Sequence, residues 1–179
     1  MMKKTLMAGF AASAITTAAF AGKPVTTTIT LDETQLDTLV EIYQEEKVAR
    51  DVYITLGDIY SNQTVFANIQ ESEQTHIDQA EVLCDKYGAD TSGIHEQKVG
   101  EFVLPHMQEL YDTMVASGST SELGALMVGE YIEITDIEDL ENAAEGMPSD
   151  VVKTYESLKE GSLNHLAAFR AAIEAYQNR

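Results

Sequence analysis

The stretch ESEQTHIDQ, residues 71–79, places Glu73 and His76 three residues apart. That spacing puts both side chains on one face of an α-helix. Their neighbours at helical spacing, Ile69 and Ala80, are apolar, so this face is expected to meet the core. Either the helix is rotated and the two polar groups face water, or they converge with others on a buried site.

Outward from this stretch, the apolar periodicity predicts four long helices and a short one. The expected ranges are 32–60, 64–87, 105–117 (the short helix), 121–145 and 149–177. Asp32 and Ser121 are suitable N-caps, Gly88 is a natural helix stop, and Pro105 can open a helix. The predicted fold is all-α, a four-helix bundle. The long crossover, which contains the short helix, makes the second and third long helices parallel, as in ferritin-like folds.

Each long helix has an apolar stripe that polar residues interrupt near the middle of the helix. These interruptions are Glu46, then Glu73 with His76, then Glu130 with Glu133, then Ser162 with His165. In a bundle of aligned helices the midpoints share one level, so these side chains can meet in one layer between apolar layers. Unpaired carboxylates in such a layer would be very unfavourable, and bound cations would resolve this.

Carboxylate ligands with one or two imidazoles suit iron or manganese. Arg50 lies beside the first stripe and could pair with one carboxylate instead. Three alternatives to a metal site remain open. The bundle could be metal-free with a buried polar network, a Glu on a stripe could be a rotated surface residue, and His165 could be a hydrogen-bonded core histidine.

Four motifs, in this order, resemble a rubrerythrin-related member of the ferritin-like superfamily. They are EEKVARDVY (45–53), ESEQTHID (71–78), GEYIE (129–133) and SLNHLAAF (162–169). Over residues 31–176 the chain is similar to an uncharacterised ferritin-like subfamily of bacteria and archaea, a domain of unknown function. The resemblance implies a metal site whose ligands are Glu46, Glu73, His76, Glu130, Glu133 and His165.

Two departures from the family pattern affect this expectation. Ser162 stands where the family has a Glu, so a ligand of the second metal is absent unless Glu130 or Asp136 compensates. The chain has one cysteine, Cys84, and therefore lacks the four-cysteine iron module of full-length rubrerythrins. Cys84 lies on an apolar face and is expected to be buried and inert.

The resemblance implies a di-metal carboxylate oxidoreductase, with di-iron first and manganese or a single or mixed metal as variants. Its chemistry would be reduction of peroxide or O2, or oxidation of ferrous iron. The partners implied are metal ions, an external electron donor and a second copy in a homodimer. The alternative is a metal-binding or structural module without turnover. Tyr43 and Tyr53, near Glu46, are expected to be packing residues, with a redox role as the alternative.

The charge and the N-terminus set further limits. The chain has 11 basic and 30 acidic residues, a net charge of −19, which disfavours binding to nucleic acid and to anionic lipid. Residues 1–21 combine a basic start, a small apolar run and an A-x-A pattern, which predicts a secretory signal cleaved near Ala21 and Gly22. An uncleaved anchor is the alternative. We expect a loose lead over 22–30 and one exported domain, periplasmic or extracellular, over 31–179.

Overall fold

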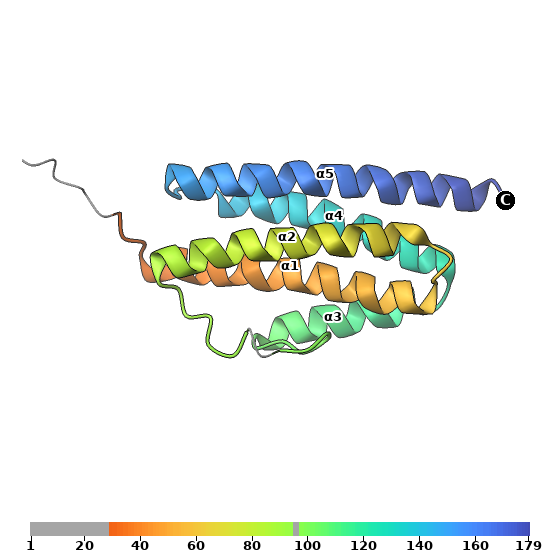
Figure 1. The fold of residues 1–179 in the computed structure, drawn as a ribbon, viewed down its shortest axis with the longest axis horizontal. Coiled ribbons are helices and arrows are strands. Elements are labelled where there is room, and N and C mark those ends of the chain that lie inside the picture. Colours follow the sequence, from red (N-terminus) through yellow and green to blue (C-terminus); the bar gives the residue numbers. More distant parts are fainter. Residues whose placement is uncertain (1–28, 95–96) are drawn as a thin grey trace, which may run out of the picture.

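The computed structural model describes residues 29–94 and 97–179, and this part of the chain is all-helical, with five helices and no strand (Figure 1). The expected secretory signal and the lead up to residue 28 lie outside the described residues. The helices are α1 (Glu33–Ile59), α2 (Thr64–Tyr87), α3 (Pro105–Gly118), α4 (Glu122–Ala143) and α5 (Ser149–Gln177). None of them combines the length and the apolar character that crossing a membrane requires.

The helix ends lie within two residues of the ranges that the sequence predicts. The Asp32 carboxylate accepts the backbone N–H of Gln35 at 2.9 Å, and the Gln35 side chain accepts that of Asp32 at 3.1 Å, which completes a capping box. Ser121 caps α4 in the same way through its hydroxyl. Gly88 ends α2 with φ 74°, a left-handed conformation that suits glycine, and Pro105 is the first residue of α3.

The four long helices contact one another in a closed circuit, α1 with α2, α2 with α5, α5 with α4 and α4 with α1. In Figure 1, α2 and α4 run in one direction and α1 and α5 in the other. The segment between α2 and α4 crosses the length of the molecule and contains α3, which packs on α1 and α4. The parallel course of α2 and α4 agrees with the long connection between them.

The apolar core consists of two clusters. The first includes Leu39, Leu83 and Leu158, and the second includes Leu56, Phe66 and Phe169. Along each of the four long helices, the buried residues of one cluster come before, and those of the other come after, the polar residues that interrupt the stripe, which are Glu46, Glu73 with His76, Glu133, and Ser162 with His165. The core is therefore divided by a polar layer at mid-length.

Cys84 lies in the first apolar cluster, where its thiol is fully buried and donates to the Leu39 carbonyl oxygen at 3.5 Å. Burial raises the pKa of Cys84 to about 12. The thiol is thus protonated and shielded, as its place on an apolar helix face predicts.

A buried lysine ties the crossover segment to α1. The Lys47 ammonium donates to the Asp51 carboxylate at 2.5 Å and to the carbonyl oxygens of Lys98 and Glu101 at 3.0 Å each. Asp51 in turn accepts the backbone N–H of Gly100 at 3.0 Å. This ion pair therefore satisfies backbone groups of a loop and fixes the loop against the helix.

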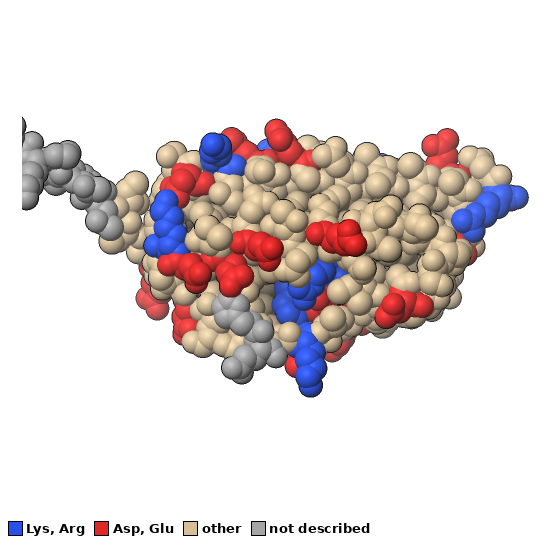
Figure 2. All heavy atoms as spheres, in the orientation of Figure 1, with Lys and Arg blue, Asp and Glu red and all other residues tan. Residues whose placement is uncertain are grey.

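The acidic balance of the sequence is visible on the surface. On the face that Figure 2 shows, acidic side chains are spread along the length of the helices, and do not gather in one patch. The net charge therefore does not locate a binding site on this face, and a candidate site has to be sought in the arrangement of carboxylates between the helices.

Candidate metal centre

The polar layer contains six buried side chains, which we call the central polar cluster. Its members are Glu46 on α1, Glu73 and His76 on α2, Glu133 on α4, and Ser162 and His165 on α5. Each is at most 6% exposed. They reach one site because each interrupts an apolar stripe at the same level of its helix.

Glu73 is the centre of this cluster. Its Oε2 atom lies 3.1 Å from His76 Nδ1, and its Oε1 atom lies 2.8 Å from His165 Nδ1. Glu46 Oε2 is also 3.1 Å from His76 Nδ1, and Glu133 Oε2 is 3.5 Å from His165 Nδ1. Two imidazoles therefore alternate with three carboxylates across four helices.

The two imidazole rings stack on each other, with centroids 5.3 Å apart and planes inclined by 27°. Gly161 makes room for this arrangement, because a Cβ atom at that position would overlap with His76 Nε2. A glycine inside a helix normally weakens it. Here its missing side chain allows α5 to pass directly over the imidazole of α2.

Tyr53 fixes the carboxylate on α4. Its hydroxyl donates to Glu133 Oε1 at 2.6 Å, and both side chains are buried. The ring packs against Phe66 and Phe169, with centroids 6.2 and 5.1 Å away. Tyr53 is thus a packing residue, as the sequence predicts, and it also orients a member of the cluster.

The charges in the cluster are strongly coupled. Burial by itself would raise the pKa of Glu73, but the neighbouring imidazoles of His165 and His76 lower it to about 2. Burial would lower the pKa of both imidazoles, but the neighbouring carboxylates raise it to about 11 for His76 and about 9 for His165. Without a cation, an ionised Glu73 therefore lies between two protonated histidines.

The pKa values of the two outer carboxylates, Glu46 and Glu133, are raised, in contrast to that of Glu73. Burial, reinforced by the charge of Glu73, raises the pKa of Glu46 to about 8 and that of Glu133 to about 7. Glu46 Oε1 is buried and has no hydrogen-bond partner. Protons thus take the place that a cation could fill, and one oxygen has no partner at all.

The donor set fits a metal ion. Glu73, His76 and His165 offer one ligand atom each, and these atoms lie within 4.8 Å of one another. Among the described residues, no lysine or arginine forms a salt bridge with a carboxylate of the cluster. Arg50, which could have served, binds Asp51 and Gln74 instead.

Glu130 is the one proposed ligand that the structure does not bring into the cluster. Its carboxylate accepts from the Arg170 Nε atom at 2.8 Å, and the side chain is 29% exposed. Glu130 lies one turn before Glu133, and Asp136 lies one turn after it. The Asp136 carboxyl approaches the cluster in place of Glu130. Burial and the charges of Glu46, Glu73 and Glu133 hold its pKa well above the usual range.

Ser162 occupies the level where the family pattern predicts a carboxylate. Its hydroxyl donates to the Leu158 carbonyl oxygen at 3.1 Å, and it also lies close enough to Asp136 to lower the pKa of that carboxyl. The side chain that approaches this position therefore comes from α4. Sequence periodicity allowed Asp136 as a substitute for the missing Glu but did not select it over Glu130.

Comparison with known proteins identifies the family. The family model DUF2202, described as an uncharacterized protein domain, matches residues 35–179. The chain belongs to the DUF2202 family. The structure of this DUF2202 protein contains the whole matched segment apart from residues 95 and 96, and all members of the central polar cluster lie within it.

A protein of Methanocaldococcus jannaschii, named Uncharacterized protein MJ0754, is 40% identical to this DUF2202 protein over 147 residues. The match covers 82% of this chain and 78% of the relative. The crystal structure described as hypothetical protein MJ0754 from Methanococcus jannaschii DSM 2661 superimposes with a TM-score of 0.79 and 39% identity, over 84% of this chain and 85% of that chain. The helical arrangement is therefore shared with a solved relative.

Proposed function

We propose that this DUF2202 protein is a rubrerythrin-related, ferritin-like four-helix bundle whose central polar cluster binds two metal ions, with iron as the first candidate and manganese as the second. The observation that carries this proposal is the alternation of three buried carboxylates and two imidazoles around Glu73. Carboxylate oxygens with imidazole nitrogens are the donors that these metals take in helical bundles.

A metal-free network is less consistent with the cluster. Its two outer carboxylates are unfavourable as anions in a buried site, and the Glu46 Oε1 atom has no partner. A cation would remove both problems at once, because it supplies positive charge and accepts electron pairs from several oxygens.

The proposed activity is reduction of peroxide or O2, or oxidation of ferrous iron. A bound iron pair would supply the one-electron steps of this chemistry. Glu46, Glu73, Glu133 and the two histidines would hold it, and Tyr53 would keep Glu133 oriented through its 2.6 Å hydrogen bond. The two apolar clusters would exclude bulk water on either side. With one cysteine in the chain, electrons would come from a separate donor.

Binding without turnover is the second candidate function, and Ser162 is the observation that favours it. A hydroxyl that donates to a backbone carbonyl is a poor replacement for a ligand carboxylate. A domain with one firmly held metal could store or sequester the ion and not use it for catalysis.

One experiment separates these functions. The domain is freed of metal, loaded with ferrous iron without oxygen, analysed for bound iron, and then exposed to air while its near-ultraviolet absorption is followed. About two irons per chain that oxidise with a new ferric band support the oxidoreductase. One iron that does not oxidise supports the binding module, and no bound metal contradicts both.

Two variants test the site itself, with an exposed neighbour as the control. Glu73→Ala and His76→Ala are expected to abolish metal binding and its stabilising effect, whereas Thr75→Ala, on the exposed face of α2, should leave both unchanged. If the two buried variants bound as much metal as the wild type, the cluster would not be the site.

We also propose that the chain is exported, on the strength of the apolar run and A-x-A pattern in residues 1–21. N-terminal sequencing of protein from the native host should then begin near Gly22. A mature chain that begins at Met1 would contradict export by cleavage.

A further inference from the structure

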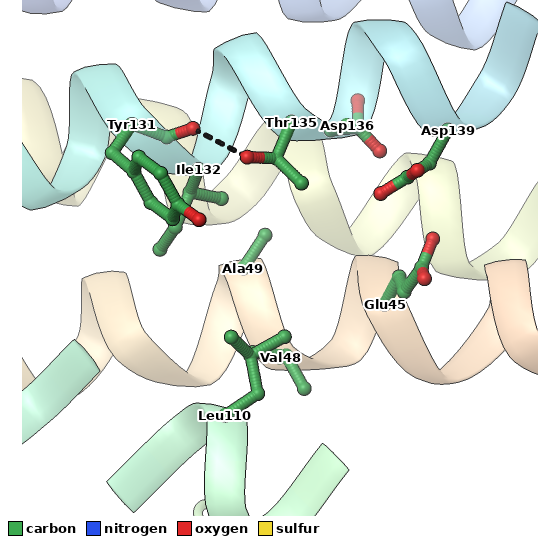
Figure 3. A pocket seen from close by; sticks show the side chains of 9 residues that line it. All are labelled: Glu45, Val48, Ala49, Leu110, Tyr131, Ile132, Thr135, Asp136 and Asp139. Carbon is green, nitrogen blue, oxygen red and sulfur yellow. Dashed lines mark hydrogen bonds between the residues drawn. The ribbon is translucent and has the colours of Figure 1, made fainter. Parts of the chain in front are cut away.

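A pocket on the side of the molecule opens between α1 and α4, beside α3 (Figure 3). We call it the acidic pocket, because one end is lined by three carboxylates, Glu45 from α1 and Asp136 and Asp139 from α4. Figure 3 shows Glu45 and Asp139 pointing toward each other across the gap between the two helices, with Asp136 one turn before Asp139 on α4. The remaining lining is mostly apolar.

The acidic pocket lacks positive charge. Within the part of the chain that the structure describes, none of its three carboxylates forms a salt bridge with a basic side chain. Glu45 Oε2 is buried and has no hydrogen-bond partner. The arrangement favours a small cation over any other ligand.

Asp136 connects this pocket to the central polar cluster. It lines the pocket, and it lies one helical turn after Glu133, a member of the cluster, on α4. It also lies near Ser162, where the cluster lacks a carboxylate. On the other side of the pocket, Glu45 directly precedes Glu46, whose buried Oε1 atom has no partner, so carboxylates of the pocket adjoin the cluster on both α1 and α4.

We propose that the acidic pocket is the loading site through which a divalent cation enters the central polar cluster, and that Asp136 replaces the carboxylate missing at Ser162 as a ligand of the second cation. This inference rests on the proposed function, because it requires a metal in the cluster. Glu45 and Asp139 bind the arriving cation only in transit, whereas Asp136 keeps contact with it once it reaches Glu46. The ligand class is a divalent cation that accepts oxygen donors.

The test uses Co2+ alone, without oxygen, and follows its visible absorption in a titration and in a stopped-flow mixing experiment. The wild-type chain should bind about two ions. Asp136→Asn, which keeps the shape of the side chain, should bind one fewer. Glu45→Gln and Asp139→Asn should bind the same number as the wild type but load on the order of ten-fold more slowly, because they remove charge from the entrance. Glu109→Gln, an exposed acid on α3, is the control for loss of one charge.

A compensating pair guards against simple misfolding of the variants. Asp136→Ala with Ser162→Glu moves the carboxylate from α4 to α5 and should restore binding of the second ion. The inference is overturned if Asp136→Asn binds as many ions as the wild type, or if the two entrance variants load as fast as Glu109→Gln. If the wild type itself binds no ion, the proposed function fails first, so the two failures are distinguishable.

Discussion

Gly161 shows how one missing side chain shapes the site. Glycine inside a helix usually costs about 1 kcal/mol relative to alanine, and the sequence alone indicates a weak point in the last helix. The structure gives the reason, since a Cβ atom there would overlap with the His76 imidazole. Gly161 therefore weakens α5 locally, but it allows α5 to pack closely on α2.

Gly161→Ala should reverse the usual gain from removing a helical glycine. The added methyl would displace His76, so we expect roughly ten-fold weaker metal binding and lower stability of the metal-free chain. Isothermal titration with Mn2+ and urea unfolding measure the two effects. Ser157→Ala, at an exposed position of the same helix, should raise stability by a few tenths of a kcal/mol. Equal stabilisation by both substitutions would contradict the packing argument.

Two buried tyrosines form a matched pair for the next prediction. The Tyr53 hydroxyl donates to Glu133, whereas the buried Tyr155 hydroxyl has no hydrogen-bond partner. Tyr53→Phe should cost about 1–3 kcal/mol in the free energy of unfolding, because it leaves a buried carboxylate oxygen unsatisfied. Tyr155→Phe should be neutral or stabilising. Urea unfolding measures the free energy of unfolding of both variants. A larger loss of stability in Tyr155→Phe than in Tyr53→Phe would contradict the proposed role of the Tyr53 hydroxyl.

At the scale of helices, the sequence predicts where each helix begins and ends better than it predicts which side of the helix faces the core. Asp32, Ser121 and Pro105 mark helix starts through local hydrogen bonding and backbone geometry, so the ends could be placed from neighbouring residues alone. Glu130 and Asp136 each lie three residues from Glu133, and periodicity treats them alike. Which one faces inward depends on contacts with other helices, such as the Glu130–Arg170 pair, that the sequence does not reveal.

The same limit applies to residues outside the apolar stripes. Glu46, Glu73, His76, Glu133 and His165 could be found because each interrupts a stripe, and the structure brings all five together. Glu45 interrupts none, because it lies beside the stripe and faces α4. Its burial arises from the packing of α1 on α4 near α3, which is a property of the tertiary structure.

The tie between Lys47 and the crossover predicts a local effect. Lys47→Met keeps the aliphatic stem but removes the donors to the Lys98 and Glu101 carbonyl oxygens, so residues 98–101 should exchange their amide hydrogens faster while α2 and α5 keep their protection. Hydrogen exchange with mass spectrometry measures this. Lys98→Met, at a largely exposed side chain, is the control, and equal exchange in both variants would contradict the role of Lys47.

At the scale of the whole molecule, the coupled charges make stability depend on pH. Glu46 and Glu133 have raised pKa values of about 8 and 7, so their contribution is complete below their unfolded pKa of about 4.5 and is lost as the pH rises through 7 to 8. His76 and His165, with pKa values of about 11 and 9, contribute fully below about 6.5 and lose that contribution as the pH rises through 9 to 11. Glu73, with a pKa of about 2, contributes above about 4.5 and loses its contribution as the pH falls through 2.

The metal-free protein should therefore be most stable near pH 4 to 5 and lose stability toward pH 9, by at most about 1.4 kcal/mol per pH unit for each group concerned. Metal binding should show the opposite trend and tighten as the pH rises, since the ligands must release their protons. Urea unfolding at pH 5, 7 and 9, with and without Mn2+, measures both trends. A metal-free stability that increases between pH 5 and 9 would show that the cluster is not protonated as described.

Cys84 has a practical consequence for such measurements. Its thiol is enclosed in the first apolar cluster and donates a hydrogen bond to the Leu39 carbonyl oxygen, so a thiol reagent can reach it only when this cluster opens. The rate of labelling at Cys84 therefore counts openings of the core with a probe that the natural chain already carries. Comparing that rate in loaded and metal-free protein would show how often the interior opens while a cation is held, without any engineered reporter.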